Sequence, residues 1–294
     1  MKLKKLDIKD KDHFERSLGI EKHSLSTYAF QNIYIWKNLF NIYWVEIKNS
    51  LCIFFEDNGI YFLYLPPLGG SKDPETIEKV FAIMNEKNLN KDFSRIENIE
   101  ERDIGFYKKL GYGYKLRSCD YMCSKNDLTG LKGDRFKSKR SAYNYFIKHY
   151  RFECTDLSIR HSEECLGLYR LWMEQRKDPD VLYQGMLKDN LAALEALFKS
   201  YGSLKYSGKI VKIDGSIKAF TIGFEINKEA FCVMYEVTDL SVKGLAQFIF
   251  REFSNCLPYK YINIMDDSGL DNLKRVKLSY CREKINSYSA NNIP

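Results

Sequence analysis

The chain has 294 residues, of which 45% are hydrophobic and 29% charged, and it carries a formal net charge of +7. This composition is typical of a soluble globular protein with one large or two medium domains. The basic start, MKLKKLDIKDKDHF, is followed by no apolar run, so we expect that it is not a signal peptide. The most apolar windows are interrupted before they reach membrane-spanning length. We therefore expect a cytoplasmic protein without an integral membrane segment.

The first half of the chain predicts an α/β unit. A strand within residues 3–10 leads to a short helix, and apolar residues at helical spacing predict a second helix over residues 24–39. Strands are expected at 42–47, 51–56 and 60–65, with a strong hairpin signal at Asp57-Asn58-Gly59. Helices over 73–88 and 100–110 then alternate with strands over 94–98 and 112–121.

The second half repeats this order of elements. A strand over 152–156 precedes helices over 162–176 and 188–201, and a meander is expected from strands at 204–206, 209–213 and 216–226. A strand over 230–237, a helix after Gly244, a strand over 261–265 and a terminal helix and strand follow. We infer a structural duplication with domains at 1–128 and 151–294, joined by a basic bridging segment at 129–150.

The bridging segment carries a dense positive charge. Residues 132–151 contain seven Lys or Arg against a single Asp. Such a patch could meet the phosphates of an RNA or a phospholipid, or it could be a solvated helix face. Nearby aromatic residues could stack on a base, although at helical spacing they more often pack inward.

The eight cysteines do not predict a metal site. Cys119 and Cys123 form the only close pair, and neither a second pair nor a neighbouring His completes a zinc site. None of the four histidines lies in an HExxH arrangement, so metal-assisted hydrolysis lacks ligands. We expect the cysteines to be buried free thiols, as is usual in a cytosolic protein.

The densest cluster of chemically useful residues lies between Asp239 and Tyr280. Gly244 stands in a turn that leads into a helix, and the free N–H groups of a helix start can hold an anion. Asp266 and Asp267 follow a buried strand, where they could accept a proton. Equally, Asp residues before Ser-Gly are common turn formers and helix caps.

Two sets of motifs resemble known families. The stretch Ser241-Val242-Lys243-Gly244-Leu245-Ala246 matches the Gly and Ala of the GNAT acyltransferase motif Gln/Arg-x-x-Gly-x-Gly/Ala, but not its first position. The segments LSTYAFQNIYIW, DYMCSKNDLTGLKGDRFKSKRSAYNYF and YINIMDDSGLDNLKRVKLSY resemble a bacterial family over essentially the whole chain. That family is grouped with the C-terminal domain of phosphatidylglycerol lysyltransferase and shares a tandem GNAT architecture with the Fem aminoacyltransferases. The resemblance implies an α/β (α+β) fold of two GNAT-like domains, each a mixed, mostly antiparallel sheet flanked by helices.

The resemblance also points to individual residues. In the basic segment it selects Lys139, Arg140 and Asn144, and at the C-terminal end it selects Asn263, Asp266, Asp267, Gly269, Leu273, Lys274, Lys277, Ser279 and Tyr280. The family's Gly-Leu-Arg is Asn272-Leu273-Lys274 here, which removes a bidentate donor.

The resemblance implies an aminoacyl- or acyltransferase with an amine or hydroxyl acceptor. Asp266, Asp267 and Tyr280 are the candidate catalytic residues, because they could move protons to and from the reacting oxygens. The candidate substrate-binding residues are Lys139, Arg140, Asn144, Gly244, Asn263, Lys274 and Lys277.

Aminoacyl-tRNA is the favoured donor, because the basic segment suits tRNA phosphates whereas Ser241 departs from the CoA motif. The acceptor could be a small polar molecule, a peptide or a lipid headgroup, and the oligomeric state is not indicated. The alternative is a catalytically inactive GNAT-like scaffold that binds a polar ligand or nucleic acid.

Overall fold

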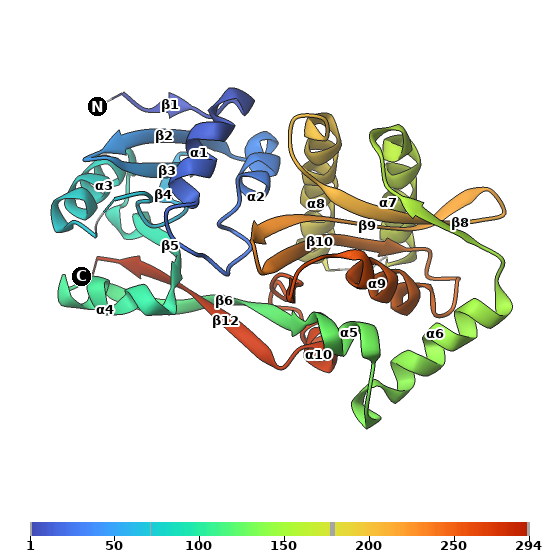
Figure 1. Ribbon diagram of the computed structural model, residues 1–294. Coiled ribbons are helices and arrows are strands. Elements are labelled where there is room, and N and C mark those ends of the chain that lie inside the picture. The colour runs from blue at the N-terminus through green and yellow to red at the C-terminus, as the bar shows by residue number, and fades with distance from the viewer. Residues whose placement is uncertain (1, 71, 177–179, 293–294) are drawn as a thin grey trace. The chain divides into compact units, whose positions relative to one another are not determined.

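The computed structural model describes residues 2–70, 72–176 and 180–292, which form two compact units (Figure 1). The first unit comprises the chain up to Asp120 together with the residues from Lys284 onward. The second comprises Tyr121–Glu283 and therefore includes the basic segment.

The first unit is a sheet covered by helices. Its strands are β1 (Lys4–Lys5), β2 (Asn41–Ile47), β3 (Ser50–Asp57), β4 (Ile60–Leu63), β5 (Arg95–Glu100), the start of β6 (Gly113–Ser124) and β12 (Glu283–Asn291). Its α-helices are α1 (Lys11–Leu18), α2 (Phe30–Ile35), α3 (Pro74–Lys87) and α4 (Ile104–Lys109), with 3-10 turns at Ile8–Asp10, Trp36–Asn38, Lys91–Phe93 and Glu101–Asp103. The strand order is β1-β2-β3-β4-β5-β12-β6. Of the described strand pairs in this unit, β4–β5 is parallel, and β1–β2, β2–β3, β3–β4 and β5–β12 are antiparallel.

Two tight turns set the register of the β2–β3–β4 meander. Lys48 and Asn49 both have positive φ, as do Asn58 and Gly59, which is the backbone of the two-residue turns that match strand twist. The hairpin predicted at Asp57-Asn58-Gly59 is confirmed. The core beneath them joins Val45 and Phe54 of the sheet to Val80 and Met84 of α3, all of them buried.

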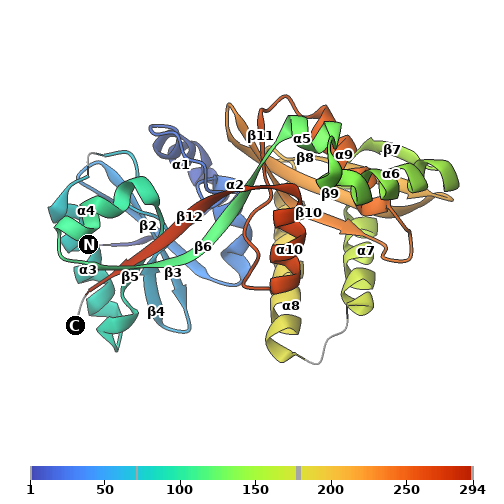
Figure 2. The same ribbon diagram turned by 90° about the horizontal axis from the view of Figure 1, so that it is seen from below.

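The second unit also has helices on both faces of a sheet. Its strands are the end of β6, β7 (Glu153–Asp156), β8 (Ser207–Ile213), β9 (Ser216–Asn227), β10 (Ala230–Thr238) and β11 (Tyr261–Asn263), in the order β6-β11-β10-β9-β8-β7. Its helices are α5 (Lys125–Gly130), α6 (Lys137–His149), α7 (Ser162–Gln175), α8 (Val181–Ser200), α9 (Leu245–Cys256) and α10 (Asp271–Tyr280), with 3-10 turns at Asp134–Phe136 and Ile159–His161. Helices α7 and α8 cover one face of β8–β10, and α6 and α9 cover the other (Figures 1 and 2).

The predicted fold class is confirmed, and three local predictions need correction. The helix expected over 24–39 begins at Phe30, because the N–H groups of Ser24 and Ser26 bind the carboxylates of Glu100 and Asp120 instead of helical carbonyls. Helix α8 begins at Val181 rather than at residue 188, and the Asp180 carboxylate caps its first turn. Residues 204–206 do not form a strand, because β8 begins at Ser207.

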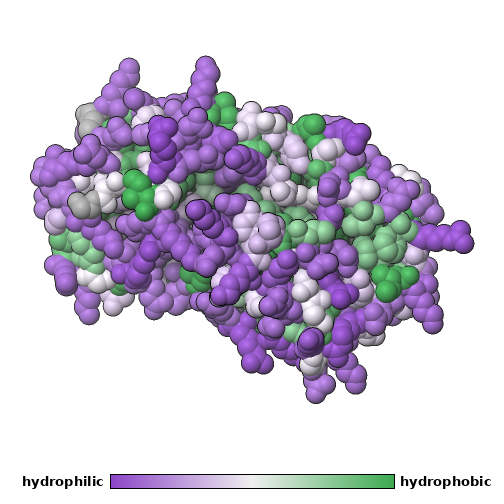
Figure 3. Space-filling view, in the orientation of Figure 1, coloured by the Kyte–Doolittle hydropathy of each residue, from purple (hydrophilic) through white to green (hydrophobic). Residues whose placement is uncertain are grey.

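Within the described residues no helix is both long and apolar enough to cross a membrane. The face of the molecule shown in Figure 3 is mainly hydrophilic, with small apolar patches between polar side chains.

Candidate functional site

In the second unit, strands β10 and β11 begin side by side and then diverge. Strand β11 pairs with β10 in parallel, but only over Ala230–Cys232. After Asn263 the chain follows β6 instead, since the Ile264 N–H donates to the Tyr121 carbonyl and the Tyr121 N–H donates to Met265. The rest of β10 pairs with β9 on its other side, so no described strand covers its β11-facing edge beyond Cys232.

Glu236 stands on this uncovered part of β10. It is the one charged residue of the strand, and its side chain is exposed although both neighbours in sequence are buried. Although part of the side chain is in contact with solvent, protein atoms surround the carboxyl group, and this burial raises the pKa of Glu236 to about 8, while the positive charge of Lys277 opposes that shift. A carboxyl group with such a pKa exchanges protons near neutral pH, which is the property of a general acid or base.

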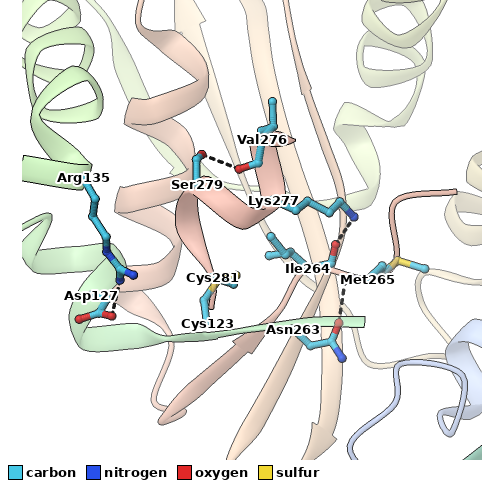
Figure 4. The surroundings of a disulfide bond; sticks show 10 residues. All are labelled: Cys123, Asp127, Arg135, Asn263, Ile264, Met265, Val276, Lys277, Ser279 and Cys281. Carbon is cyan, nitrogen blue, oxygen red and sulfur yellow. Dashed lines mark hydrogen bonds and ion pairs between the residues drawn. A yellow bond between two sulfur atoms is a disulfide. The ribbon is translucent and has the colours of Figure 1, made fainter. Parts of the chain in front are cut away.

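Lys277 fixes α10 to the turn after β11. From a position one turn before the end of the helix, its ammonium donates to the carbonyl oxygen of Ile264 (Figure 4) and to that of Asp266. The same ammonium is near enough to Glu236 to lower its pKa. Lys277 therefore places a positive charge between the end of β11 and the uncovered edge of β10.

Tyr280 and Lys139 form the other side of the cluster. The Lys139 ammonium lies 4.4 Å from the ring centroid of Tyr280, and the Phe250 ring of α9 meets the same ring edge-on at 5.1 Å. Burial, followed by the negative charge of Glu236, raises the pKa of Tyr280 above its ordinary value, although a hydrogen bond with Gln247 opposes the shift. Tyr280 is therefore a protonated phenol at neutral pH.

Lys139 is a buried cation held by aromatic rings. Its residue is 9% exposed, and within the described part of the chain it has no hydrogen bond or ion pair to a carboxylate. Burial, followed by repulsion from Arg135, lowers its pKa. A buried ammonium without a counter-ion is a costly arrangement that an anionic ligand would relieve.

The polar residues after β11 build the turn itself. The Asn263 side chain is buried and accepts the Met265 N–H at 2.7 Å, which supports the positive φ of Met265. Asp267 accepts the Tyr121 hydroxyl at 2.5 Å and the Gly269 N–H at 3.0 Å. These contacts are typical of a residue that stabilises a turn. Neither of them involves Glu236.

Gly244 is explained by a close helix contact. Its φ is +83°, and a Cβ atom there would lie 2.1 Å from the Ala142 carbonyl oxygen of α6. The start of α9 therefore approaches the α6 backbone more closely than any residue with a side chain would permit.

A carboxylate already occupies the turn before Gly244. Asp239 accepts the Ser241 N–H at 3.0 Å and the Ser241 hydroxyl at 2.7 Å, and it also binds Gln175 and Lys218. Burial works to raise the pKa of Asp239, but these hydrogen bonds outweigh it and hold the pKa well below its ordinary value. The Asp239 carboxylate, paired with the Lys218 ammonium at 3.0 Å, therefore stabilises the turn that leads to Gly244 and takes up the hydrogen-bond donors of Ser241.

The remaining predicted residues do not join the cluster. Arg140 donates to the carbonyl oxygens of Leu131 and Gly133, so it closes the loop before α6. Asn144 on α6 and Lys274 on α10 are exposed. They belong to surfaces of two helices rather than to the cluster around Tyr280.

The prediction that the cysteines are free is wrong for two of them. Cys123 of β6 and Cys281, the residue after Tyr280, are joined in a disulfide (Figure 4). Sequence spacing could not reveal the pair, because 158 positions separate the two residues. The free cysteines among the described residues are Cys52, Cys119, Cys154, Cys165, Cys232 and Cys256. No group of three or more His, Cys, Asp or Glu within the described residues could hold a metal ion.

The sequence analysis missed Glu236 and Gln247. The one signal for Glu236 is that it is the only charged residue in the strand AFCVMYEVT. Gln247 has no such signal, since a Gln on an amphipathic helix is ordinary.

Comparison with known proteins places the chain in a family. The model of the family described as "Phosphatidylglycerol lysyltransferase, C-terminal" matches residues 19–291. No curated protein sequence matches the chain. A conserved protein of unknown function from Bacteroides thetaiotaomicron is 24% identical, with 98% of each chain covered and a TM-score of 0.89.

More distant structures share the fold. L-PGS from Bacillus licheniformis is 15% identical and gives a TM-score of 0.69 over 98% of this chain and 93% of its own. A tandem GNAT protein from the clavulanic acid biosynthesis pathway is 7% identical and gives a TM-score of 0.52 over 100% and 99% of the two chains. With a family match that spans nearly the whole sequence, the chain belongs to the phosphatidylglycerol lysyltransferase C-terminal family and has its tandem GNAT-like fold.

Proposed function

We propose that the protein is an aminoacyltransferase that moves an aminoacyl group from aminoacyl-tRNA to an amine or hydroxyl acceptor. The observation that carries this proposal is the group formed by Glu236, Lys277, Tyr280 and Lys139 beside the uncovered edge of β10. It combines a carboxyl group that titrates near neutral pH with a protonated phenol and two cations. Family membership supports a transfer reaction of this class.

Each group has a role in the transfer. The acceptor nitrogen or oxygen attacks the ester carbonyl carbon, and the Glu236 carboxylate takes the proton that the nucleophile loses. The ester C–O bond then breaks, and the Tyr280 hydroxyl protonates the departing ribose oxygen. The proton on Glu236 returns to Tyr280 through solvent, so no proton is gained or lost by the enzyme.

The cations neutralise the negative charges of the reaction. Lys277 stands beside Glu236 and can stabilise the oxyanion of the tetrahedral intermediate. The buried ammonium of Lys139 suits a phosphate of the tRNA end, which would supply the missing counter-ion. Asp266 and Asp267 contribute through the turn that Lys277 holds.

The donor is proposed to be aminoacyl-tRNA rather than acyl-CoA. Asp239 already takes up the donors of Ser241 in the turn before Gly244, and the Ala142 carbonyl of α6 lies against the glycine, so this turn offers a pyrophosphate few free donors and little room. Exposed lysines along α6, Lys137 and Lys148 among them, can contact RNA phosphates. A tRNA-dependent reaction would take place in the cytoplasm. For the acceptor we propose one of three classes: a small polar molecule, a peptide amine or a lipid headgroup.

The test is transfer from a charged donor. Total tRNA charged with radiolabelled amino acids is incubated with the protein and with each acceptor class in turn, and label in the acceptor is measured. We expect Glu236→Gln to lower the rate by about a hundredfold or more, whereas Glu174→Gln, an exposed change on α7, leaves it unaltered. Binding of charged tRNA should weaken steeply as salt rises.

Two outcomes would overturn the proposal. A folded protein that neither binds nor uses any charged tRNA would not be an aminoacyltransferase. Tight binding of CoA in a calorimetric titration, with acyl transfer from acyl-CoA, would replace the donor.

A further inference from the structure

The first unit contains a small pocket that is separate from the residues described above. It has a cavity volume of about 40 Å³, and its walls include His23, Tyr28, Lys72, Asp103 and Tyr107. Each water-sized group occupies roughly 10–15 Å³ on this measure, so the cavity has room for a polar head and one or two attached carbons.

Tyr107 forms a buried polar wall of the pocket. The residue is 2% exposed, yet its hydroxyl has no hydrogen-bond partner among the residues that the structure describes. Burial, and then the negative charge of Asp103, raises the pKa of Tyr107, so the hydroxyl keeps its proton. Buried hydroxyl groups nearly always have partners, so the Tyr107 hydroxyl beside this cavity is available to a polar group that enters it, whether water or a ligand.

The buried carboxylate of Asp103 is the anionic wall of the cavity. Its side chain is 8% exposed and forms an ion pair with Lys72, whose side chain is 46% exposed and enters from the surface. The other carboxylates in or near the cavity have cations of their own: Glu21 pairs with Arg102, Asp73 with Lys48, and the buried Glu100 with His23 and Arg102. Asp103 is therefore the carboxylate whose cation a ligand could replace.

Lys72 therefore shows what the pocket accepts. A buried carboxylate needs a partner that donates hydrogen bonds and carries positive charge. Lys72 supplies both from the rim, and it leaves the Tyr107 hydroxyl unused. A ligand with a compact ammonium could reach Asp103 and also donate to the Tyr107 oxygen.

We propose that this pocket binds the primary ammonium group of a small organic amine, which replaces the Lys72 ammonium on Asp103 and hydrogen-bonds to Tyr107. Glu21 and Lys72 are both about half exposed at the rim, so an alkyl chain attached to the ammonium can leave between them. The cavity is too small for a quaternary ammonium. The inference does not depend on the proposed transferase activity, because every residue in it belongs to the first unit.

The experiment is a titration of the whole chain with ethylammonium chloride, followed by NMR and calorimetry, with tetraethylammonium chloride and sodium acetate as comparison ligands. We expect saturable binding of ethylammonium alone. Lys72→Ala removes the internal competitor and should tighten binding by about tenfold, the effect of one charge-assisted hydrogen bond. Lys91→Ala removes an exposed lysine of the same unit and should change nothing.

Two further variants test the contacts. Asp103→Asn should abolish binding, and Tyr107→Phe should weaken it by about three- to tenfold, the effect of a neutral hydrogen bond. Tyr107→Phe removes only the hydroxyl, so it serves if Asp103→Asn does not fold. Absence of ethylammonium binding in folded wild-type and Lys72→Ala proteins would overturn the proposal. So would equal binding of tetraethylammonium, or unchanged binding in Tyr107→Phe.

Discussion

The Lys139 ammonium and the Tyr280 ring are in direct contact, 4.4 Å apart, and this contact joins the first turn of α6 to the last residue of α10. A cation over an aromatic face contributes about 0.5–2 kcal/mol. Burial of an ammonium without a carboxylate costs more than such a contact returns. The position of Lys139 therefore suits the binding of an anionic ligand, and it lowers the stability of the protein without that ligand.

Replacing Lys139 should separate these two effects. Lys139→Met keeps the length of the side chain and removes the charge, so we expect the free energy of unfolding to stay the same or to rise by about 1 kcal/mol. Binding of charged tRNA should weaken by about tenfold. Urea denaturation and filter binding measure the two quantities. Lys137→Met, an exposed change on the same helix, is the matched control. A strongly destabilised Lys139→Met protein with unchanged binding would contradict the assignment.

Glu236 should make stability depend on pH. Its pKa is raised in the folded protein to about 8 from an ordinary value of 4.5. The folded state therefore holds the proton more tightly than the unfolded state. The contribution is fully present below pH 4.5, and it is lost as the pH rises to 8. Glu236→Gln should remove this part of the pH dependence.

Denaturant titrations between pH 5 and 8.5 measure that contribution. The wild-type protein should lose more stability over this range than the Glu236→Gln variant. Parallel curves for the two proteins would show that Glu236 titrates in its ordinary range. The rate of transfer should rise over the same interval, because the base must be ionised.

Gly244 should tolerate no side chain. Gly244→Ala combines a left-handed backbone with a Cβ atom 2.1 Å from the Ala142 carbonyl oxygen, so helices α6 and α9 must move apart. We expect a loss of about 2–4 kcal/mol in unfolding free energy. Gly269→Ala is the control, because its φ is also positive (+73°) but open space surrounds it. That change should cost about 1 kcal/mol. Equal losses in urea denaturation would mean that the contact with α6 is easily relaxed.

Loss of the Cys123–Cys281 disulfide should loosen α10. The bond closes a segment of 158 positions, and chain entropy alone gives such a crosslink up to about 5 kcal/mol. Cys281→Ser should therefore lower the thermal midpoint, and the transfer rate should fall because Tyr280 is the preceding residue.

The control for the disulfide is Cys119→Ser, which alters a free cysteine on the same strand. Mass spectrometry of the intact protein, alkylated with and without a reductant, counts the free thiols. Full alkylation of the untreated protein would show that the two thiols are not linked.

The sequence predicts local structure well where a single physical signal dominates. The Asn58-Gly59 turn requires a backbone that these residues readily adopt, and the hairpin is found where it was expected. The helix that follows Asp73-Pro74 begins at Pro74 because the Asp73 carboxylate caps it. The family motifs likewise led to the tandem GNAT-like fold.

Long-range contacts set the limit of prediction. The loop before α2 depends on carboxylates that lie 76 and 94 positions away, and no periodicity reveals them. Glu236 is a candidate site residue because β11 diverges from β10 after Asn263. That divergence depends on how the strands pair in the folded protein, so no local sequence pattern predicts it. The disulfide is of the same kind, since neither cysteine has a partner near it in sequence.

The position of β12 has a consequence for how the chain folds. This last strand pairs antiparallel with β5 and stands between β5 and β6 in the sheet of the first unit. During synthesis residues 284–291 leave the ribosome after the whole of the second unit, so the first unit lacks an inner strand until then. The second unit lies between the two pieces of the first in the sequence and can fold earlier. The sheet of the first unit is therefore completed only after the second unit has been synthesised.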